Sequence, residues 1–134
     1  MKNKILVLLS FMFLFSAGFS AGAGVISVNK DTYKKEVFEH KGIVLFVFSS
    51  TGCAPCITLK RDLATLKEDA KYKDVKIVEI MYNKDNKPVF DTYGIRSAPW
   101  LLVFKNGAEA ADRYQGHNRD LFLAEIRKDL DKLL

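Results

Sequence analysis

The sequence has few of the residues that build metal centres: two cysteines and two histidines among 134 residues. A structural zinc site takes four ligands. His40 and His117 do not stand at a zinc-like spacing, and nothing beside the cysteines supplies the two further ligands. We therefore expect no metal site and no bound cofactor, and surface or capping roles for both histidines.

No part of the chain has a cluster of charged residues of one sign. The 21 Lys and Arg residues are interleaved with 16 Asp and Glu residues, which leaves a formal net charge of +5. Internal repeats, low-complexity stretches and interior linkers are also missing. The interleaved charge argues against a nucleic-acid interface, and the missing repeats and linkers give no sign of a second domain. We expect one compact domain and a monomer.

Long hydrophobic runs are missing as well, although the N-terminus has a short one. Ile5–Phe15 is apolar except for Ser10 and follows a basic start at Lys2 and Lys4. A membrane-spanning helix needs roughly 20 apolar residues, so this run is too short. Ala21-Gly22-Ala23 comes next and fits the small-residue pattern of a cleavage site. Together these features are typical of a secretory signal peptide.

The signal peptide sets the expected domain and compartment. We predict that residues 1–23 are removed and that residues 24–134 form the mature domain, in the periplasm or another extracytoplasmic space. The alternatives are an earlier cut after Ser20 and an uncleaved segment that stays attached as an N-terminal membrane anchor. In an oxidising compartment an idle cysteine pair usually becomes a structural disulfide, so export changes how the cysteines are interpreted.

Apolar patterning predicts alternating strands and helices in the mature domain. The expected strands are Val25–Val28, Ile43–Phe48, Val75–Tyr82, Pro99–Phe104 and one near Glu109–Tyr114. The expected helices start at Asn29 or Asp31, at Cys53, at Pro88 and at Asn118, and end near His40, Asp69, Gly94 and the C-terminus. This order predicts an α/β fold with a central mixed sheet flanked by helices, parallel in its first half and antiparallel at its edge.

Both cysteines lie in the segment Thr51–Cys56, between an apolar strand and a helix. Cys53 and Cys56, two residues apart, can close into a small ring and reopen, which is redox chemistry. As a structural staple the bridge would contribute little, because the loop it closes is very short. The helix N-terminus favours a thiolate at Cys53. An inert bridge remains the alternative.

A second motif follows about 40 residues later. Tyr93–Pro99 precedes the strand and the Lys105-Asn106-Gly107 turn. Together the two motifs resemble the thioredoxin family over nearly all of residues 24–134. The resemblance implies a thioredoxin fold, a cis peptide bond at Pro99, and a substrate chain pairing with the backbone of Ala98. Trp100 either lines the substrate groove or packs in the core.

The resemblance also implies roles for the cysteines and their neighbours. Cys53 is expected to attack a substrate disulfide as the more exposed sulfur, and Cys56 to resolve the mixed disulfide. Ala54 and Pro55 between them carry no charge, whereas a histidine there would stabilise the reduced form. This favours a reductant.

Two positions depart from the family pattern. Gly52 stands where thioredoxins usually carry Trp, and Val47 stands where they bury an acid that assists the second cysteine. Glu79 in the third strand is a possible substitute for that acid, but a surface-facing glutamate is the expectation we favour.

These observations predict an exported thiol–disulfide oxidoreductase that reduces protein disulfides through a mixed disulfide. The same chemistry could run as an oxidase or isomerase, and a non-catalytic protein-binding module is a third possibility. A reductant in an oxidising compartment needs electrons, so a membrane-embedded thiol reductase is the expected electron donor. The expected cofactor is none beyond the Cys53–Cys56 disulfide itself.

Overall fold

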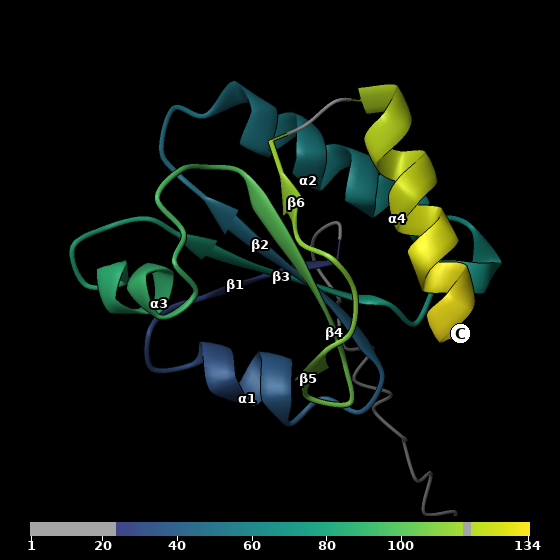
Figure 1. Ribbon diagram of the computed structural model, residues 1–134, viewed down its shortest axis with the longest axis horizontal. Coiled ribbons are helices and arrows are strands. Elements are labelled where there is room, and N and C mark those ends of the chain that lie inside the picture. The colour runs from purple at the N-terminus through teal and green to yellow at the C-terminus, as the bar shows by residue number, and fades with distance from the viewer. Residues whose placement is uncertain (1–23, 117–118) are drawn as a thin grey trace, which may run out of the picture.

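The computed structural model describes residues 24–116 and 119–134 (Figure 1). The expected signal peptide, His117 and Asn118 lie outside these ranges. The strands are β1 (Val25–Val28), β2 (Ile43–Ser49), β3 (Lys76–Met81), β4 (Trp100–Lys105), β5 (Ala108–Glu109) and β6 (Tyr114–Gln115). The helices are α1 (Tyr33–Phe38), α2 (Ala54–Leu66), a 3-10 turn η1 (Ala70–Tyr72), α3 (Lys87–Thr92) and α4 (Arg119–Leu133).

In the described part of the chain, the strands form one mixed sheet in the order β1-β3-β2-β4-β5, with β6 also paired to β4. β3 pairs in parallel with both β1 and β2. β4 runs antiparallel to β2. The predicted α/β fold with a central mixed sheet is therefore confirmed, including the change from parallel to antiparallel pairing.

Helices cover both faces of the sheet, with α2 and α4 on one side and α1 and α3 on the other (Figure 1). β2 is buried along its whole length, because each of its faces meets a helix layer. Side chains alternate between the faces with period two. Leu45 and Val47 therefore belong to the core under α2 and α4, and Phe46 and Phe48 to the core over α1 and α3.

Two regions of the chain differ from the predictions. The expected strand near Glu109–Tyr114 is two short strands, β5 and β6, which pair with opposite ends of β4. α2 ends at Leu66 rather than near Asp69, and η1 follows it. In both places local polarity and helix propensity suggested one continuous element, whereas pairing and packing divide it.

Among the described residues, no helix is both long enough and apolar enough to cross a bilayer.

Candidate active site

The two cysteines form a disulfide at the start of α2, with 5.3 Å between their Cα atoms. Cys53 is the N-cap residue of the helix, and its sulfur accepts a hydrogen bond of 3.2 Å from the backbone N–H of Cys56. Pro55 lies in the first turn, where its missing N–H is not needed. The amide that contacts the sulfur and the positive end of the helix dipole would both stabilise a thiolate on Cys53 once the disulfide is reduced.

The two sulfur-bearing residues differ in exposure. Cys53 is partly exposed, and Cys56 is 1% exposed. Gly52, before the pair, is exposed at φ 71°, and nothing lies within 4 Å of where its Cβ would be. The backbone there suits glycine and leaves the approach to Cys53 open. Ala54 and Pro55 are exposed and place no charge between the cysteines.

The Ala98–Pro99 peptide bond is cis, as the resemblance implied. Pro99 is buried and Ala98 is partly exposed, immediately before β4. Ala98 and Ser50, which lies three residues before Cys53, line the same surface hollow. The fold therefore brings the loop of the second motif next to the loop that carries the dithiol, although 40-odd residues separate them in the sequence.

Trp100 occupies a position between the two predicted alternatives. It is partly buried and packs against the core on the α1 and α3 side. Its indole N–H donates a 3.0 Å hydrogen bond to Ser97 Oγ, which also accepts a bond from Gln115. The tryptophan thus fixes the loop before Pro99, and its exposed part remains available at the surface.

Glu79 corrects a sequence expectation. We expected a surface-facing side chain, but Glu79 is 5% exposed and lies opposite Val47 in the β2–β3 pairing. Its carboxylate accepts a 2.9 Å hydrogen bond from Ser49 Oγ and forms an ion pair with Lys60 of α2. The expectation was wrong because β3 lies inside the sheet, where both faces are covered. A buried carboxylate with two partners satisfies its charge and lone pairs.

Lys60, the ion-pair partner of this carboxylate, lies on the helix that carries the dithiol. It lies four residues after Cys56 on α2, so the two side chains share one face of the helix. Because Lys60 reaches Glu79 from that face, the ion pair lies beneath the first turns of α2, on the side where Cys56 is buried. The position taken by an acid in the family pattern is apolar here, and a buried acid, Glu79, lies opposite it on the neighbouring strand.

Ile57 was missed as a surface residue. It lies in the first turn of α2, and its side chain is 62% exposed beside the buried Cys56. The helical spacing indicates this exposure, because Leu59, Leu63 and Leu66 form the inward-facing stripe and Ile57 lies outside it. An exposed aliphatic side chain next to the dithiol extends the surface that a partner would meet.

Tyr93, at the start of the second motif, belongs to the core rather than to the chemistry. Its ring lies edge-on to Phe46 and Phe48, and burial raises the pKa of its hydroxyl to about 12. It therefore stays protonated near neutral pH. Among residues 24–116 and 119–134, no three His, Cys, Asp or Glu side chains gather where they could hold a metal ion.

A helix-capping cysteine pair beside a cis-proline loop, on a mixed sheet flanked by helices, defines a thiol–disulfide exchange protein. The sequence model of the Thioredoxin family matches residues 24–128. The chain belongs to the thioredoxin family, and its cysteine pair identifies it as a thiol–disulfide oxidoreductase.

Individual relatives agree with this assignment. A thioredoxin of Rickettsia felis is 31% identical over 105 residues, which cover 78% of this chain and 97% of the relative. The M-type chloroplastic thioredoxin of Chlamydomonas reinhardtii is 39% identical over 84 residues, 60% of this chain and 56% of that one. A thioredoxin f2 solved with ferredoxin:thioredoxin reductase superimposes with a TM-score of 0.68 at 27% identity, covering 79% of this chain and 94% of that one.

Proposed function

We propose that this protein is an exported reductant of protein disulfides. The observation that carries the proposal is the unequal exposure of the two cysteines: a partly exposed Cys53 at the helix N-terminus and a buried Cys56 one turn further on. One sulfur can meet a substrate, and the other can only act afterwards. The neutral Ala54 and Pro55 support the reducing direction, because a positive charge there would stabilise the reduced form.

The first step is attack by Cys53. In the reduced protein its thiolate attacks one sulfur of a substrate disulfide, the substrate S–S bond breaks, and the other substrate sulfur leaves as a thiolate. Cys53 and the substrate are then joined by a mixed disulfide. The backbone of Ala98 is the expected docking site for the extended substrate chain. The shared hollow beside Ser50 supports that placement.

The second step requires Cys56 to lose its proton. Cys56 then attacks Cys53 Sγ, re-forms the internal disulfide and releases the second substrate sulfur. Because Val47 cannot accept a proton, Glu79 is the group we assign to receive it, directly or through a water molecule. Lys60 and Ser49 are its partners in the structure. In total, the substrate disulfide gains two electrons and two protons, and the protein loses them.

The oxidised protein must then be reduced again. A membrane-embedded thiol reductase is the donor we propose, and protein disulfides are the proposed substrates. The solved neighbour bound to ferredoxin:thioredoxin reductase supports the idea that this fold can dock on a dedicated reductase. Cleavage after Ala23, an extracytoplasmic location and a monomeric state complete the proposal. N-terminal sequencing of protein recovered from cell fractions tests the first two, and sedimentation tests the third.

The redox potential decides the direction of electron flow. Equilibration with glutathione buffers, followed by counting of free thiols, should place the Cys53–Cys56 couple near the thioredoxin value of about −270 mV. A potential near −180 mV or higher would instead assign the protein to the isomerases or oxidases. These alternatives use the same residues and differ only in the stability of the reduced form.

Alkylation separates the enzyme from a non-catalytic binding module. The reduced protein should lose one thiol quickly and stoichiometrically to iodoacetamide at pH 6, because the Cys53 thiolate already forms there. A free cysteine titrates at about pH 8.5 and would react slowly at that pH. Equal, slow reaction of both thiols would favour the module.

A further inference from the structure

A hollow of about 360 Å³ opens beside the dithiol on the α3 side of the molecule. Ser50 and Ala98 form its edge toward the active site. From there it extends over the start of α3, where Lys87, Phe90 and Asp91 line it. Its volume falls in the range of cavities that accept small ligands or side chains. A substrate chain lying on Ala98 would pass directly over its mouth.

The walls of the hollow are held by the fold. Phe90 and Ile95 form a buried apolar floor, at 2% and 3% exposure. Tyr82 packs edge-on against Phe90 at 5.2 Å and is still 48% exposed, so its ring forms a side wall. The backbone N–H of Tyr82 donates a 2.7 Å hydrogen bond to Ser49, which fixes this wall to the end of β2. The hollow is therefore a preformed feature.

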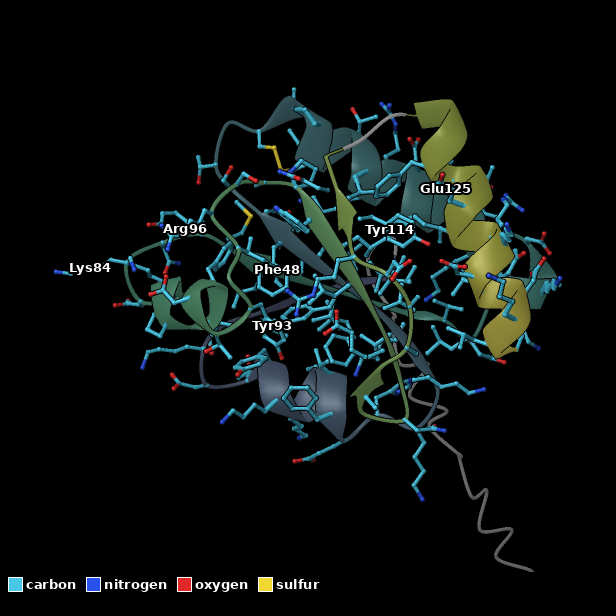
Figure 2. All side chains as sticks on the ribbon, in the orientation of Figure 1. Phe48, Lys84, Tyr93, Arg96, Tyr114 and Glu125 are labelled. Atoms are coloured by element: carbon cyan, nitrogen blue, oxygen red, sulfur yellow. A yellow bond between two sulfur atoms is a disulfide. The ribbon has the colours of Figure 1, made fainter. Side chains whose placement is uncertain are left out.

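The charge around the hollow is not balanced. Lys87 and Asp91 neutralise each other in an ion pair of 2.6 Å. Arg96 lines the same hollow, is exposed, and makes no hydrogen bond or ion pair with any residue the structure describes. Figure 2 shows Arg96 and Lys84 on the same side of the molecule, beside α3, and Glu125 on the opposite side. The hollow thus combines an apolar floor, an aromatic wall and one cation without a counter-ion.

We propose that this hollow is a specificity subsite that receives an acidic side chain of the substrate protein, located a few residues from its reactive cysteine. The carboxylate would pair with the guanidinium of Arg96, and the side-chain carbons would lie against Tyr82 and Phe90. The inference rests on the proposed function, since it names the substrate class for the same dithiol. It adds that the protein selects among disulfides by the charge that flanks them.

Three activated peptides test the subsite. They share one sequence and carry Glu, Gln or Lys at positions within a few residues of a cysteine. This cysteine is joined in a disulfide to 2-nitro-5-thiobenzoate. The chain carrying Cys56→Ser attacks the peptide sulfur through Cys53 and releases the coloured aromatic thiolate, so the reaction stops at the mixed disulfide. Its rate against peptide concentration gives a half-saturation concentration and a limiting rate. Rates with dithiothreitol correct for the intrinsic reactivity of each peptide.

Arg96 variants give the decisive comparison. With Arg96 present, the Glu peptide should half-saturate at about fivefold lower concentration than the Gln peptide, the effect of a surface ion pair. Arg96→Gln should remove this preference, and Arg96→Glu should transfer it to the Lys peptide. Arg61→Gln is the control, because it changes the net charge equally at an exposed position of α2. This variant should keep the preference for the Glu peptide. Added salt should weaken the preference, because it screens exposed charges.

Other results overturn the subsite. Equal half-saturation for the three peptides would do so, as would a Glu preference that survives Arg96→Gln. Loss of the preference in Arg61→Gln to the same degree would mean that net charge, and not the hollow, steers the peptides. The activated disulfide reacts with any accessible thiolate. The charge preference can therefore be measured even if the redox potential contradicts the proposed reducing role.

Discussion

The two faces of the central sheet differ in character although the same strands build them. The face under α1 and α3 is aromatic: Phe46 lies between Tyr33, Phe48, Tyr93 and Phe104, with ring centroids 4.5 to 6.4 Å apart. The core under α2 and α4 is mainly aliphatic, with Tyr72, Tyr114 and Phe122 as its aromatic members, and the buried Cys56, Ser49 and Glu79 lie on this side. Alternate residues of β2 and β3 thus serve two different environments.

This difference assigns stability mainly to the aromatic face and the redox chemistry to the face under α2 and α4. Aromatic side chains bury large apolar areas and supply much of a core's stabilisation. A buried ion pair contributes little net stability, because desolvation offsets the attraction between its charges. The Glu79–Lys60 pair therefore needs a reason other than stability, and its place beneath the first turns of α2 provides one. The following predictions test this division, from the largest expected effect to the smallest.

Substitution of either cysteine should have the largest effect and should separate their roles. Cys53→Ser should abolish reduction of a protein disulfide such as insulin, because the attacking thiolate is lost. Cys56→Ser should still attack and should accumulate a mixed disulfide, visible on a non-reducing gel and released by dithiothreitol. If Cys53→Ser accumulates the mixed disulfide instead, the two roles are reversed.

On the aromatic face, Phe46→Ala should cost about 3–5 kcal/mol of unfolding free energy, the usual effect of deleting a fully buried ring. Phe46 is 0% exposed. Urea denaturation measures the loss. The rate of Cys53 attack, measured on the folded fraction, should stay within about twofold of wild type, since no chemistry is assigned to this face.

Phe38→Ala provides the matched control, because Phe38 is 37% exposed at the edge of the same cluster and should cost far less. Equal losses from the two substitutions would contradict the assignment of Phe46 to the centre of that core.

On the other face, Glu79→Gln should act on the second step alone. Release of substrate from the mixed disulfide should slow by about a hundredfold, the lower end of what a general base contributes. Attack by Cys53 should stay within about twofold. Stopped-flow measurements of the two steps separate these rates. Glu68→Gln, which removes an exposed acid just beyond α2, should change neither step.

A second substitution sharpens this test. Val47 lies opposite Glu79 on the same face, so Val47→Asp in the Glu79→Gln background should restore part of the lost release rate. It should also lower stability, because a carboxylate in an apolar environment must be desolvated or remain protonated. If the Glu79→Gln variant releases substrate as fast as the wild type, the Glu79–Lys60 pair has a purely structural role.

The smallest effect concerns His40, which follows α1 at the edge of the aromatic face. Its Nε2 is buried and has no hydrogen-bond partner among the residues that the structure describes. Burial, followed by repulsion from Lys76, lowers the pKa of His40, while Glu36 opposes this. A lowered folded pKa means that the unfolded chain binds more protons just below pH 6.5, so stability should rise with pH in that window.

The measurement is urea denaturation between pH 5 and pH 7, compared with His40→Phe. The wild type should lose stability as pH falls below about 6.5, until the folded imidazole also protonates. His40→Phe should lack this contribution and keep only the pH dependence of other groups, such as Glu36. Parallel curves for the two proteins would mean that His40 protonates equally in the folded and unfolded states.

The sequence by itself determined the order of the elements and the place of the dithiol. Apolar runs and turn residues located β1 to β4 to within one or two residues, since these signals are local. The short spacing of Cys53 and Cys56 and the helix after them indicated a redox pair at a helix N-terminus. The second motif, through its resemblance to a family, led to the cis bond before Pro99.

Only the tertiary structure decided what surrounds that pair. β5 and β6 are separate because each pairs with a different end of β4. Glu79 is buried because β3 lies between β1 and β2 and is covered on both faces, an arrangement fixed by pairing between residues far apart in the sequence. The hollow beside Arg96 likewise joins Ser50 and Tyr82, which directly follow β2 and β3, with α3 and the loop before Pro99. Periodicity assigns a residue to a face of its own strand, and long-range pairing determines what that face meets.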